Sequence, residues 1–354
     1  MSVEFTRRRL LQVAGGAALA PLVAGCVKGG ANTETDASAG AVLRSTAKLP
    51  EPFTAALPVP PVLRPDRRID ADHYRITQRV AQAEILPGLK TEVWGYNGLF
   101  PGPTIETRSG RPAIVDHRNE LPVPSVVHLH GGRTPHQYDG YPTDLVLPAG
   151  GWHGKDYHPR EGQISHGGKR YVYPSGQPAA TLWYHDHRMD FTGPAVYKGL
   201  AGFHLIHDDA EDALGLPRGD RDIPLMICDR AFTEDGSMRY PALDPSLSDM
   251  PGVKPDFMSG VLGDCILVNG APWPQLEVSN LKYRFRILNA SNARRYRLSL
   301  DPPPPQGPSF VQVGSDGGLL GRPVAHDEIQ IAQAERFDVI VDFSGYPVGT
   351  KVTL

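Results

Sequence analysis

Lys282-Tyr283-Arg284-Phe285-Arg286-Ile287 is the stretch that most clearly indicates the fold, because charged and apolar residues alternate along it without a break. Side chains of a β-strand point alternately to opposite faces, so this alternation predicts a half-buried strand. Short strand-like runs recur on either side of it, at residues 113–115, 125–130, 181–185, 202–206, 329–331 and 337–343. The sequence does not alternate strands with long amphipathic helices, which argues against a parallel α/β architecture. We therefore expect an all-β fold.

The composition supports a turn-rich globular protein. Proline supplies 35 and glycine 38 of the 354 residues. A proline inside a helix costs about 3 kcal/mol, so this content excludes a helical bundle. The chain has 36 Lys and Arg against 39 Asp and Glu, a formal net charge of −3. Such a balance argues against a nucleic-acid partner held mainly by phosphate contacts.

The length allows two domains, and the charged stretch at residues 208–222 is the best place for a boundary. We expect β-sandwich domains at residues 66–210 and 211–354, the second incomplete at its C-terminus. A linker precedes them at residues 26–65, flexible at first and then proline-rich, with six prolines between Pro50 and Pro65. The run from Asp301 to Pro305 is expected to be a loop.

The first 25 residues read as an export signal. Arginines at positions 7–9 precede the apolar run Leu10–Ala24, which is too short to span a hydrocarbon core of about 30 Å. Paired arginines before such a run indicate export through the Tat translocase. Residues 22–26 resemble a bacterial lipobox, so Cys26 is expected to carry lipid and anchor the protein to the outer face of the cytoplasmic membrane. The alternative is cleavage after Ala20, which would leave a soluble protein.

Two cysteines remain after removal of the signal, Cys228 and Cys265. Each lies in an apolar, strand-like run, so we expect buried structural thiols. Two thiols in an exported protein also permit one disulfide, and a catalytic role is the least favoured interpretation.

Four of the 13 histidines form two His-x-His pairs, one ending a strand before Gly131 and the other following Trp183-Tyr184. These pairs are His128-Leu129-His130 and His185-Asp186-His187. Residues i and i+2 of a strand lie on the same face, about 6.5–7 Å apart, so each pair could hold one metal ion or serve two neighbouring ions. Together they would supply four imidazoles, which suit Cu, Zn, Fe or Ni. The alternative for either pair is two partly exposed strand histidines.

The sequence around these histidines resembles the two copper motifs in the first domain of three-domain multicopper oxidases. The subgroup with spore-coat laccases, bilirubin oxidases and phenoxazinone synthase is the most similar. Other resembling segments are Phe100–Ile105, Tyr197–Phe203, Leu267–Pro274, Arg284–Asn292 and Ala334–Ile340. The resemblance runs from about residue 66 to the last residue, and it implies tandem cupredoxin-like Greek-key β-sandwiches.

By this resemblance, His128 would bind a type 2 copper. A type 3 copper pair would be held by His130, His185 and His187, the last two on different ions. Asp139 matches an acidic residue that helps to deliver protons to reduced oxygen in the family. Its alternative role is that of a turn residue before Gly140.

Five histidines outside the pairs are expected to be ordinary surface residues, with His136 and His153 nearest the cluster. They are His117, His136, His153, His158 and His166. Two positions depart from the family pattern, Ala195 in place of an amide residue and His204 in place of an aromatic residue, and both bear on local packing more than on copper ligands.

The family's third domain supplies the other cluster histidines and a type 1 copper site built on a His-Cys-His run. This chain contains no His-Cys-His, and a type 1 copper needs a thiolate with two imidazoles. We therefore expect half of the trinuclear ligands, no type 1 site, and no laccase activity from these 354 residues alone.

The leading hypothesis is a multicopper oxidase that couples oxidation of a phenol, pigment or metal ion to reduction of O₂ to water. Its partners would be O₂ and a small reducing substrate, with membrane contact only through the lipid anchor. The alternative is a non-catalytic, exported cupredoxin-like protein that binds copper or acts as a scaffold. A His-x-His hydrolase would need a βα barrel, which the strand pattern does not support.

Overall fold

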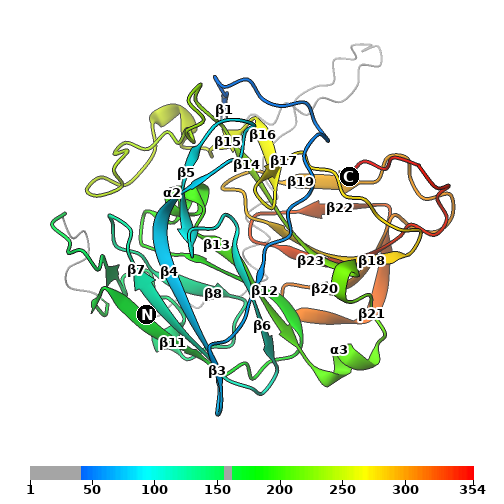
Figure 1. The fold of residues 1–354 in the computed structure, drawn as a ribbon, viewed down its shortest axis with the longest axis horizontal. Helices are drawn as coiled ribbons and strands as arrows, with labels where there is room; N and C mark the ends of the chain where they lie inside the picture. The colour runs from blue at the N-terminus through cyan, green and yellow to red at the C-terminus, as the bar shows by residue number, and fades with distance from the viewer. Residues whose placement is uncertain (1–40, 155–161) are drawn as a thin grey trace, which may run out of the picture. The chain divides into compact units, whose positions relative to one another are not determined.

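The computed structural model describes residues 41–154 and 162–354, so the export signal, Cys26 and His158 lie outside the described residues. Strands dominate these ranges, which confirms the all-β prediction (Figure 1). No helix among the described residues is long and apolar enough to cross a membrane.

Two five-stranded sheets pack together in the N-terminal half. We call the first the outer sheet; its order is β11-β7-β4-β3, with β5 also paired to β4. The second, the middle sheet, has the order β2-β6-β13-β12-β8. The outer strands are β3 (Arg67–Arg68), β4 (Asp72–Ala83), β5 (Thr91–Tyr96), β7 (Ala113–Asn119) and β11 (Gly168–Tyr173). The middle strands are β2 (Val62–Leu63), β6 (Gly102–Arg108), β8 (Val127–His130), β12 (Ala180–Asp186) and β13 (Ala201–His207).

A seven-stranded sheet, in the order β17-β16-β14-β18-β23-β20-β21, forms the C-terminal half. Its strands are β14 (Asp222–Arg230), β16 (Cys265–Val268), β17 (Ala271–Pro272), β18 (Lys282–Asn289), β20 (Phe310–Ser315), β21 (Gly318–His326) and β23 (Arg336–Asp342). Three two-stranded sheets complete the described part of the fold: β1 (Val42–Leu43) with β15 (Leu262–Gly263), β9 (Val146–Leu147) with β10 (Ser165–His166), and β19 (Tyr296–Ser299) with β22 (Glu328–Ile331). The helices are short: η1 (His136–Tyr138), α2 (Thr192–Lys198), α3 (Asp209–Ala213), η2 (Gly219–Arg221) and η3 (Pro255–Phe257).

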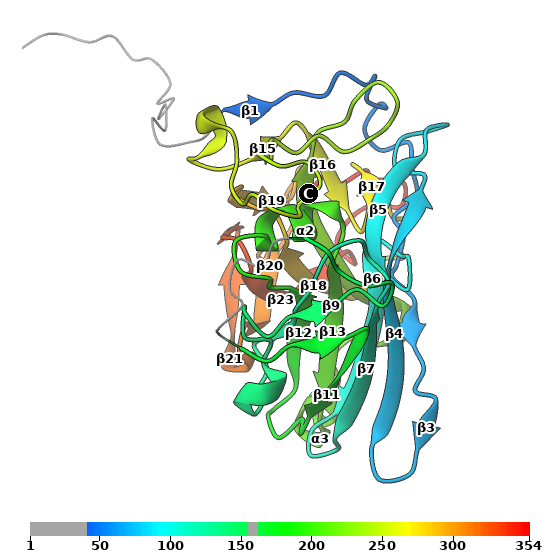
Figure 2. The ribbon, with the colours of Figure 1, turned by 90° about the vertical axis from the view of Figure 1, so that its left-hand side faces the viewer.

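The middle sheet is buried on both faces, which explains why β12 lacks a solvent-exposed side. Leu182 and Tyr184 enter the core shared with the outer sheet. Trp183, between them, enters a second core shared with the seven-stranded sheet. Figure 2 shows the same order of layers, with β4 and β7 on one side, β12 and β13 between, and β20 and β23 on the other. The middle sheet therefore positions its strand ends against both neighbours.

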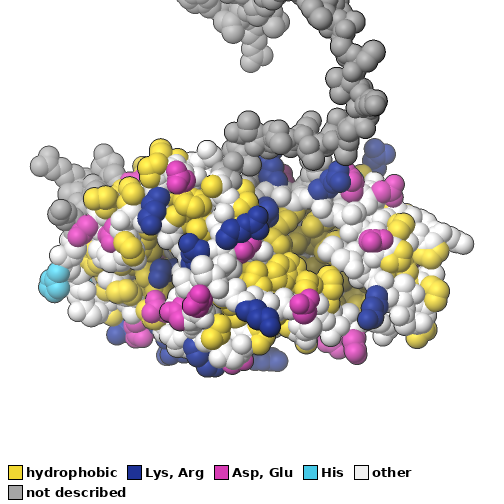
Figure 3. Space-filling model, turned by 90° about the horizontal axis from the view of Figure 1, so that it is seen from above, with side chains coloured by type: hydrophobic (Ala, Val, Ile, Leu, Met, Phe, Trp, Pro, Cys, Tyr) yellow, Lys and Arg dark blue, Asp and Glu magenta, His cyan; other side chains and the backbone are white. Residues whose placement is uncertain are grey.

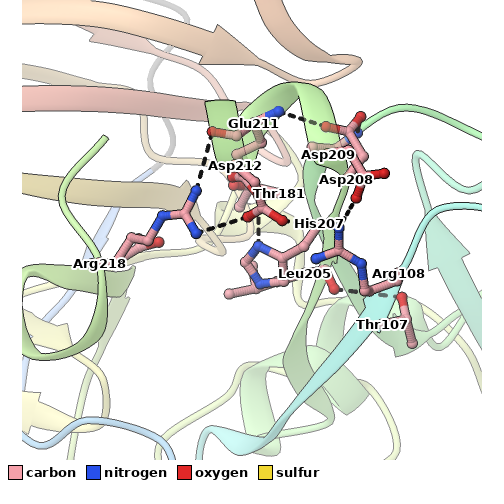
Figure 4. Close-up of polar contacts among 12 residues, drawn as sticks. Thr107, Arg108, Thr181, Leu205, His207, Asp208, Asp209, Glu211, Asp212 and Arg218 are labelled. Carbon is pink, nitrogen blue, oxygen red and sulfur yellow. Dashed lines mark hydrogen bonds and ion pairs between the residues drawn. The ribbon is translucent and has the colours of Figure 1, made fainter. Parts of the chain in front are cut away.

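The charged stretch predicted as a boundary forms α3 and η2. The side chain of Asp208 caps α3 by accepting a hydrogen bond from the backbone N–H of Glu211 (2.7 Å). His207, at the end of β13, contacts the Glu211 carboxylate through Nδ1 (2.6 Å; Figure 4). Division of the chain at residue 210 stays a prediction.

The segment at residues 41–57 differs from the predicted tether. Strand β1 pairs with β15, and the Ser45 hydroxyl donates to Asp264 (2.6 Å). The backbone N–H of Leu57 donates to the carbonyl of Gln275 (2.8 Å). Composition predicted a flexible segment up to residue 49 and a stiffer, proline-rich stretch after it, and these long-range hydrogen bonds hold residues 41–57 against the C-terminal half.

The surface agrees with a balanced charge. On the face drawn in Figure 3, basic and acidic side chains are interspersed with apolar ones.

Candidate metal centre

The two histidine pairs meet because they lie on neighbouring antiparallel strands of the middle sheet. In the register of β8 and β12, His128 lies opposite His185, and His130 lies opposite Trp183. His187 follows the end of β12, where its backbone N–H donates to the carbonyl of Val126 (3.0 Å). The strand pairing thus joins segments that are far apart in sequence.

The four imidazole rings form one cluster, which we call the histidine cluster. The centroid of the His128 ring lies 5.5, 5.4 and 5.3 Å from those of His130, His185 and His187. One ring nitrogen from each of His128, His130 and His185 lies within 4.8 Å of the other two. The His187 ring lies 5.5 Å from that of His185 and borders this group of three. These three histidines could hold a metal ion.

Hydrogen bonds to backbone carbonyls determine which ring nitrogens can bind a metal. Nδ1 of His128 donates to the carbonyl of Asp139 (2.5 Å), and Nδ1 of His185 donates to the carbonyl of Asp186 (2.8 Å). Each bond keeps the proton on Nδ1 and leaves Nε2 as a lone pair, as is usual for metal-binding histidines. Nε2 of His185 lies 3.4 Å from Nδ1 of His130. Two imidazole nitrogens bound to one ion at about 2.0–2.1 Å have a similar separation.

Burial favours the neutral form of three of these imidazoles. It lowers the pKa of His130 to about 4, with the positive charge of Arg336 adding to the effect. Burial also places the pKa of His185 well below its ordinary value and lowers that of His187. Nδ1 of His187 is buried without a hydrogen-bond partner in the structure. A neutral imidazole with an unpaired buried nitrogen suits a metal ligand.

Trp183 orients two of the rings. Its indole stacks on His185 with centroids 4.0 Å apart and on His130 at 5.3 Å. Because Trp183 is itself packed in the core between the middle and seven-stranded sheets, the ring planes of both histidines are held by that core.

Asp139 lies beside His128, where the resemblance placed an acidic residue. Its carboxylate accepts from the Thr134 hydroxyl (3.0 Å) and lies 3.6 Å from Nδ1 of His128. The carboxylate is half-exposed, so it also contacts solvent. Asp139 is the C-cap of η1, and Gly140 follows with φ +79°, so the residue also acts in a turn. A Cβ at Gly140 would lie 2.2 Å from the carbonyl of Val127, which requires glycine there.

Comparison with known proteins agrees with this geometry. Residues 78–211, which include all four clustered histidines, match the sequence profile of the family described as Multicopper oxidase. A laccase from Bacillus subtilis (strain 168) is 43% identical over 326 residues, covering 84% of this chain and 60% of that protein. A bilirubin oxidase from Albifimbria verrucaria is 34% identical over 310 residues, covering 83% and 48% respectively. The solved structure of a laccase from Pediococcus acidilactici superposes with a TM-score of 0.73 at 35% identity, covering 88% of this chain and 60% of that one.

The chain belongs to the multicopper oxidase family.

The predicted family is thereby confirmed, and so is the cupredoxin-like all-β class. This multicopper oxidase chain spans between about half and 60% of the length of the relatives named above. Copper is the cofactor of the family, and a donor set of neutral imidazoles fits it. The structure brings together all four predicted ligands, although the assignment of each to a type 2 or type 3 ion stays a prediction.

Sequence reasoning missed Gln177, which holds the turn after His130. Its side-chain N–H donates to the carbonyl of Gly131 (3.0 Å), and its carbonyl oxygen accepts from the backbone N–H of Arg133 (2.6 Å). Gln177 is buried in the loop before β12. In the sequence, Gln177 stands between Gly176 and Pro178, which indicates only a turn. Its role could not be predicted, because the contact joins residues about 45 positions apart.

The prediction for His117 was wrong. It lies on β7 and is buried, with its ring edge-on to those of Tyr96 (5.7 Å) and Tyr171 (5.5 Å). Burial lowers its pKa to about 3. The apparent loop position is the interior of a strand whose two neighbours, β4 and β11, cover it.

The remaining histidines behave more nearly as expected. His136, His153 and His166 are exposed, and His136 lies in η1 next to Asp139. His204 is fully buried in the aromatic position of the family pattern, with Nε2 3.0 Å from the Thr107 hydroxyl, and burial lowers its pKa to about 3. The other departure, Ala195, is buried in α2.

Both cysteines are buried and free, as predicted for structural thiols. Burial raises the pKa of Cys228 and raises that of Cys265 to about 12. A neutral thiol is a poor nucleophile, which agrees with a packing role for each.

Proposed function

We propose that the chain holds copper at His128, His130, His185 and His187 as part of a multicopper oxidase. The enzyme would couple one-electron oxidation of a phenol, pigment or metal ion to four-electron reduction of O₂ to water. One observation carries the proposal: two strand ends bring four imidazoles together, and burial lowers the pKa of three of them, His130, His185 and His187. Backbone carbonyls also leave Nε2 of His128 and of His185 as a lone pair.

Copper, when bound, would supply the one-electron redox chemistry of the reaction. The side chains of this chain would do the rest. The carbonyls of Asp139 and Asp186 orient the His128 and His185 rings. Trp183 covers two rings and excludes water from that side. The half-exposed carboxylate of Asp139 could pass protons from solvent toward the site.

Copper stoichiometry of the full chain tests the proposal. After loading with Cu(II) and dialysis, the wild-type chain should retain copper, and His185→Ala should retain less. His136→Ala is the matched control, because this exposed histidine lies near the cluster without joining it. Equal retention by the chain and by a variant lacking all four clustered histidines would refute the copper site and leave the scaffold interpretation.

We propose further that these 354 residues bind copper without oxidising a phenol. The sequence has no His-Cys-His, and a type 1 copper needs a thiolate with two imidazoles. Oxygen consumption with a phenolic substrate should stay at the level of free copper. Steady turnover by the copper-loaded chain would contradict this.

Export and lipid anchoring remain part of the proposal, supported by the sequence at residues 7–26. The mature protein would start at Cys26 and be attached to the outer face of the cytoplasmic membrane. Cys26→Ser should move it from the membrane fraction to the soluble extracytoplasmic fraction, and lysines in place of Arg7, Arg8 and Arg9 should block export. A mature N-terminus at Pro21 would instead show ordinary cleavage.

A further inference from the structure

One arginine of the seven-stranded sheet contacts the strand that carries the second histidine pair and lies beside the turn that follows the first pair. Arg336 begins β23, and its side chain is 2% exposed. Its Nε donates to the carbonyl of Thr181 (3.0 Å), which lies on β12 four residues before His185. The guanidinium thus contacts the backbone of the strand that ends in the second pair.

The same guanidinium packs against the turn that follows the first pair. A Cβ at Gly131, the residue after His130, would lie 2.6 Å from Nη2 of Arg336. Gly131 has φ +88°, so it turns the chain away from β8 directly beside the arginine. Arg336 therefore fills the space between β12 and the end of β8.

The arginine is itself held in place by its own half of the molecule. Nη1 donates to the carbonyl of Ala334 (2.7 Å), and Nη2 donates to the carbonyl of Asp316 (2.8 Å). The Asp316 carboxylate lies 3.1 Å from Nη1. A planar guanidinium with this many bonds has one orientation, whereas a lysine ammonium could not make the same set.

We propose that Arg336 is a positioning residue for the copper site, because it fixes the end of β8 relative to β12 and so sets the spacing of His130 and His185. The inference rests on the proposed function of the histidine cluster. Partners beyond the direct ligands commonly change metal affinity by about 10–100-fold when they are removed. Arg336 would do so through its bond to the backbone of β12 and its packing beside the turn that follows β8.

Arg230 offers a matched control. It is also a buried arginine of the seven-stranded sheet, and it also donates to backbone carbonyls of the N-terminal half, those of Tyr197 (2.7 Å) and Val196 (3.0 Å). Both carbonyls belong to α2, so through these bonds Arg230 contacts neither β8 nor β12. Loss of either arginine should lower the melting temperature, so stability alone cannot distinguish them.

The test measures Cu(II) affinity and the Cu(II) EPR spectrum of the full chain. Arg336→Met should weaken affinity by about tenfold or more and change the EPR parameters, whereas Arg230→Met should leave both unchanged. The copper affinity of Arg336→Lys should be close to that of Arg336→Met, because lysine keeps the positive charge but cannot make the several hydrogen bonds of the guanidinium. Wild-type copper affinity and EPR parameters in the lysine variant would overturn the positioning role of the guanidinium.

Asp316→Ala gives a second route if Arg336→Met fails to fold, since the Asp316 side chain is 53% exposed and the substitution is mild. It should weaken copper binding by a smaller factor. Wild-type chain that binds no copper would refute the proposed function. Wild-type binding with unchanged affinity and spectrum in Arg336→Met or, where that variant fails to fold, in Asp316→Ala would overturn this inference alone.

Discussion

The two N-terminal sheets and the seven-stranded sheet bury different kinds of basic side chain. In the N-terminal half, Nδ1 of His117, His187 and His204 is buried without a partner in the structure. In the seven-stranded sheet, Arg284 and Arg286 are equally buried, yet each meets carboxylates. Both regions therefore bury side chains that can carry a positive charge, but the histidines keep an unpartnered nitrogen whereas the arginines are paired with carboxylates.

The difference follows from acid–base chemistry. Imidazole can lose its charge, so burial lowers the pKa of His117 and His204 to about 3 and the rings stay neutral. A guanidinium cannot, so it must be paired when buried. Arg284 donates to Asp338 and Glu211 (2.7 Å each), and Arg286 donates to Asp222 (2.8 Å) and Glu211 (3.0 Å). Unpaired neutral groups remain able to bind a metal, whereas paired charges hold the fold.

The paired region should respond most strongly to loss of a charge. Burial by itself raises the pKa of Glu211, but the hydrogen bond from His207 and the charges of Arg286 and Arg284 hold it well below its ordinary value. Glu211→Gln would leave two buried arginines short of a carboxylate, so we expect a loss of about 3–5 kcal/mol in the free energy of unfolding. Urea denaturation measures it.

Asp209→Asn is the control for that substitution. Asp209 lies on the same helix and pairs with Arg108 (Figure 4), but its side chain is fully exposed. Such pairs contribute little to stability. Similar losses in the two variants would remove the distinction between the two regions.

Gly131→Ala tests the place where the two regions meet. Gly131 requires a positive φ, and its Cβ would also collide with Arg336. Gly110→Ala is the matched control, because φ is +77° there and a Cβ would meet nothing within 4 Å. The control should cost about 1–2 kcal/mol through backbone strain alone. Gly131→Ala should cost more and also weaken copper binding, as shown by calorimetry and Cu(II) titration.

Acid stability tests the unpaired region. Unfolded histidine takes up a proton below about pH 6.5, but burial keeps His117 and His204 neutral in the fold down to about pH 3. The unfolded state therefore binds more protons between pH 6.5 and 3, and stability falls as pH is lowered through that window. His117→Gln should flatten this part of the profile of unfolding midpoint against pH. The surface variant His166→Asn should leave the slope as it is in the wild-type chain, and an unchanged slope in His117→Gln would contradict the interpretation.

Gln177 should give the smallest effect. Gln177→Met loses two hydrogen bonds to the turn after His130, which costs about 1–2 kcal/mol in total. Gln177→Glu keeps the bond to Arg133 but faces the carbonyl of Gly131 with a carboxylate oxygen, so it should be the worse variant. Melting temperature and Cu(II) affinity should both decrease from wild type to Gln177→Met to Gln177→Glu. A glutamate variant equal to wild type in both would show that the Gln177 side chain does not hold the turn.

Much of the fold and the site could be predicted from the sequence. Alternation and turn residues predicted the strands that became β7, β8, β12, β13, β18, β22 and β23. The His-x-His spacing and its surroundings identified the four clustered histidines. The sequence did not indicate Gln177 or Arg336, because each reaches the cluster through the backbone of a segment far away in the chain.

Residues 282–287 show what a local sequence pattern cannot predict. Its alternation correctly predicted a strand, but the charged face was expected to meet water. Arg284 and Arg286 are instead buried beneath α3 and its Glu211. His117 departed from its pattern in the same way, since neighbouring strands cover it.

The sequence by itself therefore determined the strands, the two histidine pairs and the family, since these depend on spacing between near neighbours. Only the tertiary structure decided which polar side chains are buried, which of them are paired, and which residue of the seven-stranded sheet bonds to the backbone of β12. Burial and pairing depend on contacts between residues tens to hundreds of positions apart, and a period-2 pattern carries no information about what covers either face of a strand.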